Sequence, residues 1–239
     1  MAGSTMSRVL HLHPAFQRAM KKIVLSRQDR GFGQIGGTPL LKDLSFWPAN
    51  PQTGGLMTPI LTLTEQFQPA RFVPPGMAIT VFLAVEQQQD GGFGRPLQRR
   101  HTVNQQSELQ NVINAGFARV ILHELASQPL APSNAPVLLE RAFIDFEEMT
   151  DEEHDEEHED EDNGIGLSKP SGRPCWLQDP IYEPPRYMFM MQLVDADVAE
   201  ASPQHAGLFG EGIGYLFVDM QARRGKEGDD AGFFFIQFT

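Results

Sequence analysis

Short runs of apolar residues alternate with polar stretches along this chain, and each run is bounded by glycine, proline or aspartate. The runs are rich in Phe, Val and Ile and cover 58–63, 78–85, 117–123, 137–146, 187–194, 213–219 and 232–238. Runs of this length and composition predict β-strands. Apolar and polar residues partly alternate within 137–146, as in a strand with one face in water. We therefore expect an α+β protein dominated by mostly antiparallel sheet.

Two segments show a helical period instead. Residues 13–24 place Phe16, Met20, Ile23 and Val24 on one face, and a proline lies near the first turn, where it is tolerated. Residues 105–114 place Leu109, Val112 and Ile113 on one side. The pattern predicts a few peripheral helices beside the sheet.

An order of turns and apolar runs occurs twice along the chain. Both halves run from a Gly-x-Pro turn through a tryptophan and an apolar run to a second run with a central phenylalanine. Three matching pairs are each 135 positions apart: Gly37 and Gly172, Pro39 and Pro174, and Phe82 and Phe217. We expect an N-terminal helical segment (1–34), a first half (35–146), an acidic loop (147–167) and a second half (168–239), with the two halves in one compact domain.

The stretch GFGQIGG at 31–37 contains the G-x-G-x-x-G spacing of a dinucleotide-binding turn. Such a turn needs a strand before it and a helix after it, because the phosphates lie on the helix N-terminus. The residues before it, 26–30, are polar, and Pro39 biases Thr38 toward an extended conformation. The repeat explains these glycines better, as part of an architectural turn. Trp47 and Trp176, which follow the two turns, are then expected to be packing anchors.

Negative charge is concentrated in one place. The net charge is −12, yet residues 151–162 alone hold ten acids and no Lys or Arg, so the rest of the chain carries only −2. Two further acids, Glu147 and Glu148, directly precede this run. The chain is a near-neutral body with one acidic segment.

The repeated features resemble those of the YwqG-like family of bacterial proteins, whose activity is largely uncharacterised. The residues that carry the resemblance are 35–39 with 47–48, 176–180, 190–193 and, most specifically, 210–218. The second Gly-Gly of such proteins is Ser171-Gly172 here, and the acidic run is not a feature of the family. The resemblance implies that relatives occur beside genes for secreted toxins.

Enzyme motifs are absent from the sequence. It contains no G-x-S-x-G elbow, P-loop or C-x-x-C pair, so we expect neither an enzyme nor a cofactor. The single cysteine, Cys175, excludes an internal disulfide and fits a reducing compartment. No apolar run is long enough to span a membrane, and no secretory signal is present, which predicts a cytoplasmic protein without a membrane partner.

A histidine pair within the acidic run is a candidate for zinc. His154 and His158 have the spacing of H-E-x-x-H, but Asp155 replaces the catalytic Glu and no apolar residues surround them. A solvated acidic loop is the better interpretation. Metal binding by this run is kept as an alternative function, and an enzyme of unknown reaction as another.

The functional interpretation of the acidic run is electrostatic. Dense negative charge imitates a nucleic-acid backbone and attracts basic proteins, whereas it disfavours binding of nucleic acid itself. We expect an immunity protein that neutralises a basic toxin, such as a nuclease; a simple solvated linker is the alternative. The predicted partner-binding residues are Glu147, Glu148, Asp151, Glu152, Glu153, Asp155, Glu156, Glu157, Glu159, Asp160, Glu161 and Asp162.

Overall fold

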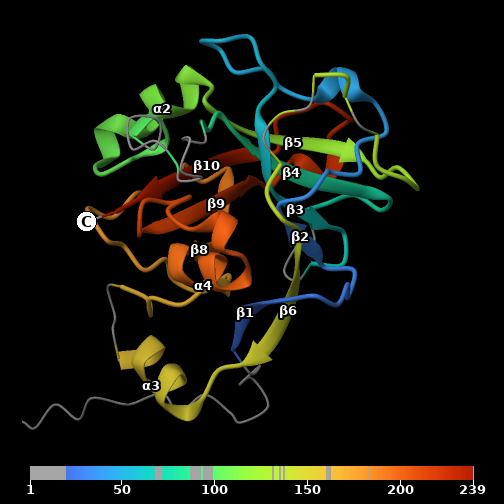
Figure 1. Ribbon diagram of the computed structural model, residues 1–239. Helices are drawn as coiled ribbons and strands as arrows, with labels where there is room; N and C mark the ends of the chain where they lie inside the picture. Colours follow the sequence, from blue (N-terminus) through green and yellow to red (C-terminus); the bar gives the residue numbers. More distant parts are fainter. Residues whose placement is uncertain are drawn as a thin grey trace, which may run out of the picture.

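Two antiparallel sheets form the body of the protein in a computed structural model, which describes residues 20–67, 72–86, 93, 99–130, 132–134, 136, 138–159, 163–182 and 184–238 (Figure 1). The first sheet has the order β1-β6-β2-β3-β4-β5 and the second the order β10-β9-β8-β7. The strands are β1 (Lys21–Ser26), β2 (Gly33–Ile35), β3 (Thr58–Thr64), β4 (Met77–Leu83), β5 (Ala118–Glu124), β6 (Ala142–Glu148), β7 (Lys169–Pro170), β8 (Tyr187–Val194), β9 (Ile213–Asp219) and β10 (Gly232–Gln237).

Three α-helices occur in the described part of the chain: α2 (Leu109–Ala115), α3 (Asp151–Glu159) and α4 (Asp195–Ala201). Short 3₁₀ helices lie at Leu44–Phe46, Arg99–His101, Gln106–Glu108, Pro203–His205 and Ala222–Arg224. The predicted α+β class with mostly antiparallel sheet is confirmed. None of the described helices is long and apolar enough to cross a membrane.

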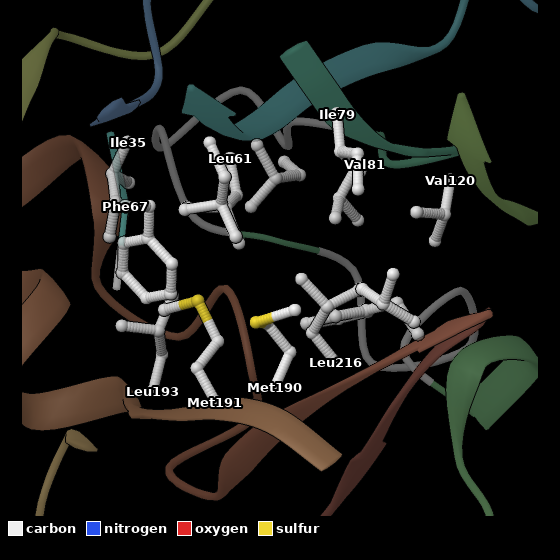
Figure 2. Packing of buried hydrophobic residues seen from close by; sticks show 14 of the residues in the cluster. Ile35, Leu61, Phe67, Ile79, Val81, Val120, Met190, Met191, Leu193 and Leu216 are labelled. Atoms are coloured by element: carbon white, nitrogen blue, oxygen red, sulfur yellow. The ribbon is translucent and has the colours of Figure 1, made fainter. Parts of the chain in front are cut away.

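The main core lies between the two sheets. Figure 2 shows side chains from both sheets pointing toward one another, and the labelled residues are at most 1% exposed. The first sheet contributes Ile35, Leu61, Ile79, Val81 and Val120, and the second contributes Met190, Met191, Leu193 and Leu216. Apolar side chains on the inward faces of the strands are therefore buried between the sheets, and their burial holds the sheets together.

The outer face of each sheet is covered by a loop that carries a tryptophan. Trp47 packs on Phe82 of β4 with ring centroids 5.6 Å apart, and its indole N–H donates to the Met57 carbonyl at 2.8 Å. Trp176 lies nearly parallel to the ring of Phe217 on β9, with centroids 6.4 Å apart. Both tryptophans are packing anchors, as predicted.

Both halves of the chain pair their strands in the same register. In the first half β2 pairs with β3 through Gln34↔Thr62, and in the second half β7 pairs with β8 through Lys169↔Gln192. A bulge interrupts the next pairing at matching places, between Pro59 and Leu61 in β3 and between Phe189 and Met191 in β8. These shared irregularities support a duplication.

The two Gly-x-Pro turns also match in backbone conformation. Gly36 and Ser171 both have positive φ, 63° and 57°, and each donates its N–H to the bulge residue, Ile60 or Met190, at 2.8 and 2.9 Å. The stretch 31–37 contains strand β2 (Gly33–Ile35) itself, and no helix begins directly after it, so the structure gives it no phosphate-binding geometry.

Backbone hydrogen bonds join the two sheets at both edges. Ala231, just before β10, donates to Val120 of β5 and accepts from Asp219 of β9, both at 2.7 Å. At the other edge the Ser168 carbonyl accepts from Ile23 of β1 at 2.7 Å, while its hydroxyl accepts from Val194 of β8 at 2.9 Å. The second junction places β1 next to the segment that leads into β7.

Three predicted elements differ from the structure. The helix expected over 13–24 is wrong from residue 21 onward, because Ile23 is buried in β1 and pairs with Phe146 of β6; residues 13–19 lie outside the described residues. The strand expected over 137–146 begins at Ala142. The expected acidic loop contains α3. The helix expected over 105–114 is confirmed as α2 with its preceding 3₁₀ turn.

The Gly36 turn yields a stability test. A Cβ at Gly36 would lie 2.5 Å from the Glu140 carbonyl oxygen, whereas one at Gly54, which also has positive φ, would meet nothing within 4 Å. We expect Gly36→Ala to lower the free energy of unfolding by about 3 kcal/mol and the control Gly54→Ala by only about 1 kcal/mol, the cost of the left-handed conformation alone. Urea denaturation measures both, and equal losses would contradict the role of the close contact.

Candidate protein-binding site on the acidic helix

The acidic run forms a helix that its own sequence supports only at the start. The Glu153 N–H donates to Thr150 Oγ1 at 3.2 Å and the Thr150 N–H donates to Glu153 Oε2 at 2.8 Å, which is a capping box. Acids in the first turn are favourable there. Farther on, like charges four residues apart, such as Glu152 and Glu156, repel each other, and nine residues are too few for a stable isolated helix. Contacts with the β-body must therefore hold α3 in place.

The main anchor is a buried ion pair between Glu157 and Lys169. Lys169 Nζ lies 2.5 Å from Glu157 Oε2, and the two side chains are 1% and 3% exposed. The same carboxylate accepts from the N–H groups of Ile165 at 2.8 Å and Arg173 at 3.4 Å. Burial lowers the pKa of Lys169, and the Glu157 carboxylate opposes that shift. The helix is thereby fixed to the Ser171 turn and to β7.

Burial of Glu157 corrects the sequence-based expectation for this residue. The residue was expected to lie on a solvated acidic surface, yet it points into the protein. The sequence holds one indication of this burial in Lys169, the partner of Glu157. Lys169 is a charged residue that follows an uncharged stretch, and it occupies the strand position that Gln34 has in the first half. Sequence alone does not show that the two charges meet.

A second, more exposed ion pair links α3 to β1. Lys22 Nζ lies 2.8 Å from Glu153 Oε1, and the two side chains are about one-fifth exposed. This hydrogen bond raises the pKa of Lys22 and lowers the pKa of Glu153. The pair stabilises the fold above the usual carboxyl pKa and loses that effect as pH falls through the lowered pKa of Glu153. Removing one partner of this exposed pair should cost less stability than removing one partner of the buried pair.

The remaining described acids of the predicted site stay in solvent. None of them has an ion-pair partner among the residues that the structure describes. They form what we call the acidic surface: Glu147, Glu148, Asp151, Glu152, Asp155, Glu156 and Glu159. Asp160, Glu161 and Asp162 lie outside the described residues. In Figure 1, α3 lies beyond the ends of β1 and β6, at the opposite end of the molecule from α2.

Among the described residues, the histidine pair forms no metal centre with its neighbours. The rings of His154 and His158 are stacked, with centroids 4.2 Å apart and an interplanar angle of 24°. His158 Nδ1 donates to the His154 carbonyl at 2.8 Å and is therefore not free for a metal. Within the described ranges, no group of three His, Cys, Asp or Glu side chains is arranged to hold a metal ion.

A cavity of about 520 Å³ lies beside β1, which Lys22 connects to α3. Its walls come from β1, from Glu147 of β6, from the segment before β7 and from α4. Asp197 and Glu200 of α4 add two acids to this wall. The sequence analysis missed both, because they lie far along the chain from the acidic run and only the junction of the two sheets brings them near it.

The buried ion pair gives a sharp stability prediction. We expect Glu157→Ala to lower the free energy of unfolding by about 3–5 kcal/mol, because Lys169 would remain buried without its counter-charge. The control Glu156→Ala, one residue away and exposed, should change stability by less than about 0.5 kcal/mol. The double variant Glu157→Leu/Lys169→Met should recover most of the loss. Denaturant unfolding measures all three variants, and a neutral Glu157→Ala would contradict the anchoring role.

Comparisons with known proteins add no relative to this picture. No family model matches the chain, and no curated protein matches it.

Proposed function

We propose that this chain is an immunity-type binding protein that neutralises a toxin with a positively charged surface. The observation that carries the proposal is the acidic surface: seven exposed carboxylates without ion-pair partners among the described residues, mounted on or beside a helix that a buried ion pair holds in place. The proposed protein acts in the cytoplasm and inhibits by binding, without a catalytic step.

Rigid presentation is what distinguishes this surface from an acidic tail. A disordered acidic segment would have to be ordered when a partner binds, and that ordering would cost conformational entropy. Here Glu157 and Glu153 already fix the helix, so the exposed charges are held in a defined arrangement. Such an arrangement can match a particular pattern of Lys and Arg on a partner and can speed its association.

A nuclease is the toxin class that best fits this charge. An enzyme that binds a phosphate backbone needs a positive cleft, and that cleft can be blocked by an acidic protein surface. The resemblance to YwqG-like proteins implies relatives beside genes for secreted toxins, and it supports a toxin as the partner without selecting the class of toxin. The proposal therefore expects the partner gene next to the gene for this chain.

Matched charge variants test the proposal with the toxin encoded by the adjacent gene. The test variant removes three charges from the acidic surface: Asp151→Asn, Glu152→Gln and Glu156→Gln. The control removes three exposed acids elsewhere: Glu86→Gln, Asp179→Asn and Glu211→Gln. We expect the association rate, measured by stopped flow or surface plasmon resonance, to fall about tenfold in the test variant and to change little in the control.

Two results would overturn this proposal. One is that no neighbouring gene encodes a toxin that the native chain binds. The other is that test and control variants lower the association rate equally, which would make net charge, not the acidic surface, responsible. Far-ultraviolet circular dichroism and unfolding midpoints establish that both variants are folded before their rates are compared.

A further inference from the structure

On the edge of β1 that faces away from β6, the backbone groups of one residue pair with no strand in the described part of the chain. β1 is the outermost strand of its sheet, and Ile23 donates its N–H to Ser168 on that edge. In an antiparallel ladder the N–H and C=O of every second residue point to the same side. The N–H and C=O of Leu25 therefore point away from β6 as well. No described strand pairs with β1 at Leu25 on that side.

The cavity of about 520 Å³ opens along this edge. Its lining includes residues 22–26 of β1 and Glu200 and Ala201 of α4. An extended segment laid along β1 would thus contact both this strand and this helix. The available backbone pairing and the hollow beside it are two separate observations at the same place.

We call this cavity beside β1 the groove. The charged residues that line it indicate which kind of extended segment could bind there. The acids in its lining are Glu147, Asp197 and Glu200, and none of them has an ion-pair partner among the described residues. The two bases in the lining, Lys22 and Arg27, already pair with Glu153 and Glu140. A second copy of the chain would bring the same acids to this edge, so like-charge repulsion disfavours pairing of β1 with its own copy.

We propose that this groove binds an extended Lys- or Arg-bearing segment of the partner protein, which adds to β1 as a further strand beside Leu25. Backbone hydrogen bonds to Leu25 would supply affinity, and alternate basic side chains would face Glu147, Asp197 and Glu200. The inference rests on the proposed function and deepens it, since the segment belongs to the toxin.

Hydrogen exchange of backbone amides, measured on the full chain with and without a defined peptide, tests whether the groove binds a basic strand. The probe is a blocked seven-residue peptide that alternates Lys and Val, and the comparison peptides carry Glu in place of Lys or N-methyl groups on alternate residues. We expect the Lys peptide to slow exchange of the Leu25 amide about tenfold, and the other two peptides to leave it unchanged. Equal slowing by all three, or by none, overturns the proposal.

A variant whose side chain fills the groove, compared with a control variant on the same helix, provides a second test. Ala201→Trp places a large side chain in the cavity wall, while Ala196→Trp makes the same change on an exposed position of α4 outside the cavity. We expect Ala201→Trp to abolish protection by the Lys peptide and to weaken toxin binding at least about tenfold, with Ala196→Trp close to the native chain. Equal behaviour of the two variants, both shown to be folded, overturns the proposal.

The outcomes separate this inference from the proposed function. If the toxin binds the native chain and Ala201→Trp equally, the proposal of a binding site in the groove is wrong, and binding of the toxin is left to the acidic surface. If the Lys peptide protects Leu25 but no toxin binds, the groove is a site for a basic strand and the immunity function is wrong. Slow exchange of Leu25 without any peptide means that residues 1–19 of this chain or a second copy occupies the edge, and it overturns the proposal.

Discussion

The ion pair between Glu157 and Lys169 is the contact on which the candidate site depends. It fastens a helix of mutually repelling acids to the second sheet, and the same carboxylate accepts backbone N–H groups from both sides of β7. Because breaking a buried pair leaves one charge without compensation, the pair resists local opening. The exposed carboxylates of the acidic surface can therefore keep a fixed arrangement despite their repulsion.

The duplicated architecture explains where that ion pair sits. In the first half Gln34 occupies the β2 position that corresponds to Lys169, and its amide donates to the Gly36 carbonyl within its own turn at 2.8 Å. In the second half the lysine reaches instead to Glu157, whose carboxylate also accepts from the Arg173 N–H in the matching turn. The position that stabilises a turn in the first half thus attaches a helix in the second half.

Sequence patterns predicted the sheet well because strand burial leaves a local signal. The apolar runs and the repeated turns located most strands and both tryptophan anchors. The helix expected at 13–24 failed at Ile23 because pairing with β6 outweighs a helical period. The burial of Glu157 and the approach of Asp197 and Glu200 to the groove depend on contacts between distant segments, which no local pattern records.

The dependence of the association rate on salt tests the central claim most directly. If the acidic surface steers a basic toxin, the rate should fall steeply as ionic strength rises from about 0.02 M to about 0.5 M, where the Debye length shrinks to roughly 4 Å. The variant that lacks three of these acids should show a shallower slope. An association rate that stays constant over this range, with the same slope for both proteins, would contradict the account.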